Sequence, residues 1–508
     1  MNSTESKYMY FLTLLFFAVS VMGILHHELW LDEAHHWLLA RDSNSISDLY
    51  NNTRSEGHPL MWNLLLYTIT RFTSNPFWMQ LVHVVISTSF VLVFLKKAPF
   101  NWVFKTLFIF GYFFIFEYNL ISRNYGLGIL FLFLAGSIFK DRNSKFILLC
   151  VYLALASNTH ILFSVVAFAL FLTLLVEQFQ NKQFFKIQTV LGCLIFVSGL
   201  FLIGIQIQTT ESDWLLNPIQ SLSFDERLKH GIVSLFEGLI AIPNFTTLHF
   251  WNTNFVIDNN RSSAAVLVVL IYLLPMVLFY KNKKTLFFVY IALIGTQIFF
   301  YITQRTAVRF HGINYIIIIL ALWMEQYYGS ENFKLKEIVT RFRLILFRKP
   351  IIYLLLLIHF FSGIYAYSVD YIHPFTSAKQ TVDYLKNEDL DSKEIVSVTC
   401  DGTIISAYLE RKVYFLCSNG YQSFCHWDSD CDRDLNQQKS VELLKQYMKN
   451  HTNCVYVSYY PLSNAQKNSS WQFITDDVKI RFLKKFDINI VNNSYYYVFE
   501  VVKEKRSF

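Results

Sequence analysis

The chain has 508 residues, of which 54% are hydrophobic and only 16% are charged, and its mean hydropathy is +0.33. Soluble proteins contain about 45–50% apolar and about 25% charged residues, so this composition excludes an ordinary soluble enzyme. The net charge of +7 does not indicate nucleic-acid binding, because the surplus cations lie in short segments between apolar runs and form no concentrated basic patch. The sequence therefore indicates an integral membrane protein without a nucleic-acid partner.

The charged residues are distributed unevenly along the chain. Residues 369–508 contain 17 Lys/Arg and 18 Asp/Glu, which is 35 of 140 residues and typical of a soluble domain. Residues 1–368 contain the other 27 Lys/Arg and 19 Asp/Glu, or 46 of 368. We expect a transmembrane catalytic domain over 1–368, with outer loops at 26–75 and 208–262, and a soluble extracytoplasmic domain over 369–508.

Eleven apolar runs in the first domain approach the roughly 20 residues that cross a hydrocarbon core. They lie at about 8–25, 76–95, 102–119, 121–139, 145–158, 160–178, 187–207, 263–280, 285–302, 309–327 and 350–368. The expected fold class is therefore an all-α polytopic membrane domain of about 11 helices, with a range of 10–13, followed by an extracytoplasmic α/β domain.

The orientation follows from the loop charges. Alternate loops carry Lys97, Lys140, Lys182, Lys283 and a six-cation stretch at 334–349. Cytoplasmic loops are enriched in Lys and Arg, so these five loops are predicted to face the cytoplasm. By parity, both long loops and the C-terminal domain face the periplasm, the cell exterior or an ER-like lumen.

The C-terminal domain has the pattern of an α/β fold. Helices are expected near 377–386, 403–410 and 440–449, and strands at 395–399, 413–416, 454–459 and 495–502. Five of the seven cysteines lie in this domain, where an oxidising compartment permits disulfides. We expect at least one disulfide, and the pair Cys425–Cys431 is favoured.

The first outer loop holds an unusual run of polar residues from His26 to Trp37, with two adjacent carboxylates, Asp32 and Glu33. Neighbouring side chains in a helix or turn point in different directions, so the two carboxylates cannot do the same work. One can act as a general base near the membrane surface while the other anchors the loop. The alternative is a solvated acidic pair at the interface.

The same run offers a weak metal hypothesis. His35 or His36 together with Asp32 has ligand types that suit zinc or manganese. Interfacial histidines beside tryptophan are the simpler interpretation, so a divalent cation is possible but no cofactor is expected to be required.

Other polar residues are predicted on the same outer face. These are Glu56, His58, Arg123, Tyr125, His160, Arg309 and His311. An Arg at the end of a membrane helix is costly unless it has a partner or a ligand, and its planar fork of donors suits a phosphate. The alternatives are that Arg123 snorkels to the interface or forms a structural salt bridge with Glu117.

These segments resemble the GT-C superfamily of integral-membrane glycosyltransferases. They are most similar to the branch with the protein O-mannosyltransferases, the lipid A aminoarabinose transferase and the rhizobial lipopolysaccharide-core transferases. The Asp-Glu pair that opens the family's first outer loop is matched by Asp32-Glu33. The family's His-Pro-Pro element is matched by His58-Pro59, with Leu60 in place of the second Pro.

The family's Ser-Arg-x-x-x-Leu-Asp pattern is matched from Ser122-Arg123 to Leu127, but Gly128 stands where the mannosyltransferases have Asp. The role of that Asp, and a preference for mannose, are therefore not carried over. His160 resembles a His of the bacterial members. The likeness covers about residues 1–370.

The resemblance implies the transfer of a sugar from a polyprenyl-phosphate donor to a glycan, lipid or protein acceptor, with inversion. Asp32 would deprotonate the acceptor hydroxyl, and Glu33 would orient the loop or a substrate hydroxyl. Arg123 would hold the donor phosphate, with Arg309 as a second candidate. The substrate-binding candidates are His58, Glu56, Tyr125, His160 and His311.

Three other functions remain open from the sequence. A glycan polymerase or ligase would also use a lipid-linked donor, but would depend on several arginines more than on a carboxylate base. A transporter or lipid flippase would place ionisable groups near the bilayer midplane, whereas the helix interiors here are almost purely apolar. A receptor or scaffold would leave the outer polar residues without a chemical role.

Overall fold

The computed structural model describes residues 3–207, 223–259, 261–304, 307–425, 436–462 and 470–504. The chain divides into two compact units. We call the first the membrane unit; it comprises Met1–Gly23, Glu56–Trp62 and Leu81–Ser368. The second, the loop–tail unit, comprises Ile24–Ser55, Asn63–Gln80 and Val369–Phe508. Most of the first outer loop thus groups with the C-terminal domain, whereas the sequence analysis assigned it to the membrane domain.

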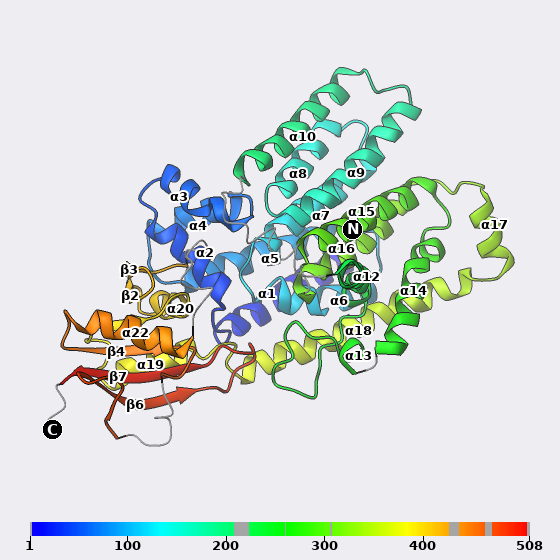
Figure 1. The fold of residues 1–508 in the computed structure, drawn as a ribbon. Helices are drawn as coiled ribbons and strands as arrows, with labels where there is room; N and C mark the ends of the chain where they lie inside the picture. Colours follow the sequence, from blue (N-terminus) through cyan, green and yellow to red (C-terminus); the bar gives the residue numbers. More distant parts are fainter. Residues whose placement is uncertain are drawn as a thin grey trace. The chain divides into compact units, whose positions relative to one another are not determined.

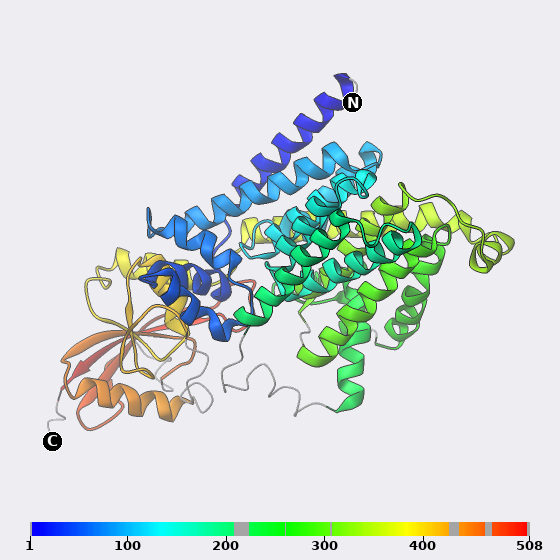
Figure 2. The ribbon, with the colours of Figure 1, turned by 90° about the horizontal axis from the view of Figure 1, so that it is seen from above.

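The membrane unit is helical, as expected. Its helices are α1 (Ser3–Ile24), α5 (Phe77–Lys97), α6 (Trp102–Ile109), α7 (Tyr125–Ile138), α8 (Phe146–Ser157), α9 (Ile161–Gln180), α10 (Ile187–Gln206), α12 (Phe224–Leu239), α13 (Phe255–Asn259), α14 (Arg261–Leu278), α15 (Lys283–Thr303), α16 (Val308–Glu325), α17 (Lys334–Arg341) and α18 (Ile345–Ile372). Within the described residues, seven are long and apolar enough to cross a membrane: α1, α5, α9, α10, α15, α16 and α18. The helices α8, α9 and α10 pack side by side (Figure 1), and the same group is seen from another side in Figure 2.

The expected count of about eleven spans includes helices that are shorter than a full span. The run expected at 102–119 is divided between α6 and a π-helical segment, η2 (Phe113–Glu117). The helix α8 stops at Ser157, where the Asn158 amide donates hydrogen bonds to the carbonyl oxygens of Ala154 and Gly199. Polar side chains at the turn therefore end the apolar run before it reaches the length of a full span.

Three membrane-unit helices, α12, α13 and α17, lie in segments that the sequence analysis treated as loops. The helix α12 lies within the segment that the sequence analysis treated as an outer loop, and its second half is buried against α15 and α16. A Cβ atom at Gly238 would lie 2.3 Å from the carbonyl oxygen of His311, so the missing side chain allows the close approach of α12 to α16. This helix carries five charged residues and a histidine, so a search for apolar runs did not find it.

The helices α7 and α9 also meet at a glycine. A Cβ atom at Gly128 would lie 2.6 Å from the ring of Phe163, which is fully buried. An aspartate at this position, as in the mannosyltransferases that the sequence resembles, would collide with the ring. The glycine at this position thus allows the close contact between α7 and the Phe163 ring of α9.

The C-terminal domain contains one seven-stranded sheet in the order β3-β2-β1-β4-β7-β6-β5, which confirms the expected α/β class. Its strands are β1 (Ile395–Ser397), β2 (Val413–Phe415), β3 (Gly420–Gln422), β4 (Asn453–Ser458), β5 (Gln472–Phe473), β6 (Val478–Phe486) and β7 (Tyr496–Lys503), and its helices are α19 (Ala378–Asn387), α20 (Asp401–Tyr408) and α22 (Gln437–Met448). The strand β1 is parallel to β2 and β4, while the other pairs are antiparallel, with Tyr456 opposite Phe499 in the β4–β7 register.

The core of this domain lies between α22 and the central strands. Leu444 and Met448 of α22 pack with Val396, Tyr456 and Phe499 in one buried cluster. The central strand β4 is buried at five of its six positions, which explains its nearly continuous apolar run in the sequence. The strand β6 was missed because four of its nine residues are Lys or Arg.

A disulfide in the C-terminal domain was expected, and the structure contains one. It joins Cys400 to Cys425, so the favoured pairing of Cys425 with Cys431 is wrong. Cys431 itself lies outside the described residues. The bond ties the start of α20 to the segment that follows β3.

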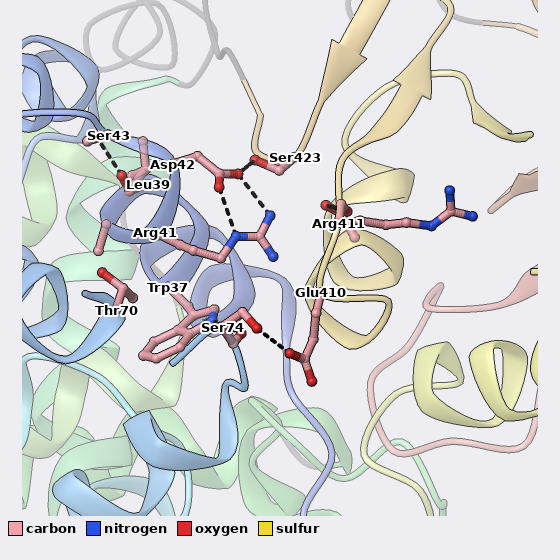
Figure 3. Close-up of polar contacts among 12 residues, drawn as sticks. Trp37, Leu39, Arg41, Asp42, Ser43, Thr70, Ser74, Glu410, Arg411 and Ser423 are labelled. Atoms are coloured by element: carbon pink, nitrogen blue, oxygen red, sulfur yellow. Dashed lines mark hydrogen bonds and ion pairs between the residues drawn. The ribbon is translucent and has the colours of Figure 1, made fainter. Parts of the chain in front are cut away.

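Polar contacts fasten the first outer loop to the C-terminal domain (Figure 3). The helix α2 (Leu31–Asp42) ends at Asp42, whose carboxylate accepts hydrogen bonds from Arg41 at 2.8 and 2.9 Å and from the Ser423 hydroxyl. Further along the loop, after α3 (Ile46–Thr53) and α4 (Met61–Thr70), the Ser74 hydroxyl donates to the Glu410 carboxylate. The conformation of this loop therefore depends on residues more than 300 positions away in the sequence.

The predicted orientation is open to a labelling test with an impermeant maleimide applied to intact cells. A cysteine at Glu388, on the exposed surface of the C-terminal domain, should react from outside. Cysteines at Lys97 and Lys283 should react only after the membrane is permeabilised, because Lys-rich loops are retained in the cytoplasm. The parent protein provides the background of native cysteines. The reverse pattern would place the candidate site on the cytoplasmic side.

The contact between Gly128 and Phe163 predicts that Gly128→Ala destabilises the protein by about 1–3 kcal/mol, because an added methyl group overpacks the helix pair. Thermal unfolding of the purified protein in detergent measures this effect. Gly204→Ala in α10 is the matched control, since a Cβ atom there would have no neighbour within 4 Å. Equal unfolding temperatures for the two variants would contradict this packing.

Candidate active site

The predicted site residues are divided between the two units. Asp32, Glu33, His35 and His36 belong to the loop–tail unit, while Arg123, Arg309 and the substrate-binding candidates belong to the membrane unit. Each group is therefore described within its own unit.

The two adjacent carboxylates lie in the first turn of α2, where the helix dipole favours negative charge. Their environments differ. Glu33 is fully buried, and its Oε2 atom accepts a hydrogen bond from the backbone N–H of Trp30 at 2.9 Å. Asp32 is only partly buried. Glu33 therefore holds the start of α2, and Asp32 is the carboxylate with access to its surroundings.

A buried histidine links Glu33 to the end of α18. The Nδ1 atom of His27 lies 2.9 Å from one carboxylate oxygen of Asp370, and its Nε2 atom lies 3.3 Å from Oε2 of Glu33. Burial alone would lower the pKa of His27, but the carboxylates of Asp370 and Glu33 outweigh it and raise the pKa to about 10. His27 is therefore a cation at neutral pH, held between two carboxylates.

The sequence analysis assigned no role to His27 and did not identify Asp370. A signal was present, because a carboxylate in the last turn of a 28-residue apolar helix needs a partner. The sequence alone does not show that the partner is a histidine 343 residues earlier.

Glu28 is a second buried carboxylate in this loop. Desolvation raises its pKa to about 8, despite the opposing charge of Lys379. Its Oε2 atom is buried and has no hydrogen-bond partner among the described residues. Glu28 therefore changes its charge close to neutral pH, whereas His27 keeps its charge.

The histidines of α2, His36 and His35, have ordinary packing contacts. The Nδ1 atom of His36 lies 2.9 Å from the side-chain oxygen of Asn63, and the ring of His35 meets the ring of Phe424 edge to face at 6.1 Å. Across the described ranges, no group of three or more His, Cys, Asp or Glu residues could hold a metal ion.

In the membrane unit, Arg123 lies in the short connection between η2 and α7 and is almost completely buried. The next residue, Asn124, donates a hydrogen bond to the carbonyl oxygen of Thr159 at 2.8 Å, which fixes this connection to the turn between α8 and α9. The sequence Ser122-Arg123-Asn124 is thus held inside the protein, where a guanidinium group needs an anionic or polar partner.

A buried carboxylate, Glu117, lies near two guanidinium groups. It accepts hydrogen bonds from Trp251 Nε1 at 3.0 Å and from the Tyr112 hydroxyl at 3.3 Å. Both Arg309 and Arg123 interact electrostatically with it. The arrangement therefore places two guanidinium groups, Arg123 and Arg309, near one buried carboxylate.

Aromatic rings and imidazoles adjoin these charges. The Tyr125 ring lies 5.0 Å from that of His160, which in turn lies 4.8 Å from the ring of His58. Phe310 lies within 6.5 Å of Tyr125, and the Arg309 guanidinium lies 4.6 Å from the Phe310 ring. The structure thus brings together the predicted residues Arg123, Arg309, Tyr125, His160 and His58. We call this group, with Glu117 and Trp251, the cationic–aromatic cluster.

Two other predicted residues have different surroundings. His311 forms an ion pair with Glu237 of α12 at 2.6 Å and packs against Phe300, so its imidazole helps to join α12 to α16. Glu56 is buried, and its backbone oxygen lies 2.6 Å from Nδ1 of His58. Trp251, which contacts both Glu117 and Arg309, was not predicted because it lies in the long loop that carries no recognised pattern.

The charge on His27 predicts a pH-dependent stability. Because its folded-state pKa lies above the ordinary value of 6.5, the stabilisation is complete below pH 6.5 and is lost as the pH rises toward 10. The difference in thermal stability between the wild type and His27→Asn should therefore shrink across this range, by at most about 1.4 kcal/mol per pH unit.

The pH dependence of wild-type stability alone does not test the charge on His27. The raised pKa of Glu28 also makes the stability fall as the pH rises to about 8. The difference between wild type and variant largely removes this common contribution. A difference that grows from pH 6.5 to 10 would show that His27 is not held as a cation.

Comparisons with known proteins give structural matches only. No family model matches the sequence, and no curated protein matches it. Among solved structures, ArnT from Cupriavidus metallidurans bound to undecaprenyl phosphate is 9% identical, with a TM-score of 0.48, and the alignment covers 96% of this chain and 97% of that chain. The same protein in the apo state gives 9% identity, a TM-score of 0.44 and the same coverage. The chain thus has a structural match over nearly its full length, at low sequence identity, to ArnT, a GT-C lipid A aminoarabinose transferase.

Proposed function

We propose that this protein is a membrane glycosyltransferase that moves a sugar from a polyprenyl-phosphate donor to a hydroxyl group of a glycan, lipid or protein. The observation that carries this proposal is the cationic–aromatic cluster, in which two guanidinium groups share one carboxylate beside rings that can pack against a sugar. The cluster lies in a unit built from apolar helices, which suits a donor with a lipid chain.

The phosphate of such a donor leaves with the polyprenyl chain when the glycosidic bond forms. Arg123 and Arg309 both interact electrostatically with Glu117, and the planar fork of donors in each guanidinium group suits a phosphate. Guanidinium groups stabilise the leaving phosphate more as it gains charge, which lowers the barrier as well as binding the donor. Tyr125 and His160 supply apolar faces and polar edges for the sugar.

The acceptor hydroxyl needs a base, and Asp32 is our candidate. Its neighbour Glu33 is engaged by Trp30 and His27, so Glu33 is a positioning residue that fixes the start of α2. This division of work matches the roles that the GT-C resemblance implies for the two residues. The reaction is then a single displacement at the anomeric carbon with inversion, in which Asp32 takes the hydroxyl proton.

Two substitutions separate these roles. Asp32→Asn keeps the shape and removes the base, so it should slow transfer by about 10²–10⁴ without weakening donor binding. Arg123→Ala should weaken donor binding by about tenfold or more, through the loss of a charge-assisted hydrogen bond, and should also slow turnover. Transfer from purified polyprenyl-phosphate sugars in nanodiscs measures the first effect, and a separate donor-binding assay measures the second.

Asp48→Asn is the matched control, because it removes a carboxylate from the next helix of the same loop. It should leave both transfer and binding close to wild type. Near-normal transfer by Asp32→Asn would move the base elsewhere. If neither variant alters the cell's glycans while deletion of the gene does, a transporter becomes the better interpretation.

A further inference from the structure

The basic stretch at 334–349 has no role in the proposed reaction, and it adjoins a pocket of about 360 Å³. We propose that this pocket binds the phosphodiester headgroup of an anionic phospholipid. The proposal is independent of the transferase function, because none of the pocket's lining residues belongs to the cationic–aromatic cluster.

Three segments of the membrane unit form the pocket: the connection that leads into α6, the end of α16 and the beginning of α18. The first segment follows Lys96 and Lys97, and the third begins with the last two cations of the basic stretch, Arg348 and Lys349. Both segments come from loops that the charge pattern assigns to the cytoplasmic side. The pocket therefore lies among residues that are predicted to meet the same lipid leaflet.

The charges around the pocket are positive. Its lining includes Arg348 and Lys349 and contains no carboxylate. Arg348 forms an ion pair with Glu325 and donates to the carbonyl oxygen of Leu278 at 2.8 Å, so it is fixed in place. Lys349 is exposed and forms no hydrogen bond or ion pair within the part of the chain that the structure describes. Its ammonium group is thus available to an external anion.

Polar and apolar groups are placed as a lipid headgroup requires. The Asn101 amide donates to the Tyr353 hydroxyl at 2.7 Å, which leaves the hydroxyl proton of Tyr353 free to bind a phosphate oxygen. The rings of Phe100 and Phe104 stack at 4.0 Å beside these groups and offer an apolar wall for the glycerol and the upper acyl chain.

The adjoining segment has the character of an interfacial helix. The helix α17 and the residues after it carry Arg341 and Arg343 beside Ile338, Phe342 and Leu346, whose apolar side chains are exposed. Such alternation of cations and exposed apolar groups suits the headgroup region of an anionic leaflet. Basic pockets between membrane helices on the cytoplasmic side are a known form of headgroup site.

Native mass spectrometry of the full-length, delipidated protein in detergent tests the proposal. The probes are dioleoyl phosphatidylglycerol and dioleoyl phosphatidylcholine, which have the same acyl chains. Phosphatidylglycerol should bind about five- to tenfold more tightly than phosphatidylcholine. This factor corresponds to an attraction of roughly 1 kcal/mol for each cation near the headgroup. Lys349→Glu should abolish this preference, and Tyr353→Phe should reduce it about threefold, as expected for one lost hydrogen bond.

Lys334→Glu is the matched control, because it reverses an exposed charge of the same basic stretch outside the pocket. It should change the preference by less than about twofold if the pocket, and not the general surface charge, binds the lipid. Equal losses for Lys334→Glu and Lys349→Glu, or equal binding of the two lipids by the wild type, would overturn the proposal. Displacement of the lipid by millimolar inorganic phosphate would also overturn it in favour of a free-anion site.

Discussion

The loop–tail unit depends on one buried cation, the His27 imidazolium. Its two nitrogens face the carboxylates of Asp370 and Glu33, and all three side chains are buried. Removing one partner from such a group leaves an uncompensated buried charge, which typically costs about 3–5 kcal/mol. The same contacts fix the end of α18, the beginning of the first outer loop and the first turn of α2. These contacts thus also fix the part of α2 on which Asp32 lies.

A second group of buried charges, around Glu117, lies in the membrane unit. Glu117 is held by Trp251 and Tyr112 and interacts electrostatically with two arginines, Arg123 and Arg309. A fully paired arginine would have little affinity for a phosphate, and an unpaired one would be costly to bury.

The sequence predicted the elements that depend on local pattern. The apolar runs became the helices of the membrane unit, and the buried strand β4 was found because both of its faces are covered. The helix α12 was not predicted because its first half is polar and exposed. The strand β6 was not predicted because lysines occupy its open face. Arg123 and Tyr125 were recognisable from their spacing, but Asp370 and Trp251 become meaningful only through contacts made by the fold. The disulfide partner of Cys425 was likewise set by the packing of α20, which sequence spacing does not reveal.

The pairing of the first outer loop with the C-terminal domain has a consequence for biogenesis. Because His27 and Asp370 are separated by 343 residues, the loop emerges from the translocation machinery long before its partner does. The later partners of the loop, Glu410 and Ser423, lie further along the chain still. The first outer loop must therefore stay without these contacts until the segments that carry Asp370, Glu410 and Ser423 have been synthesised.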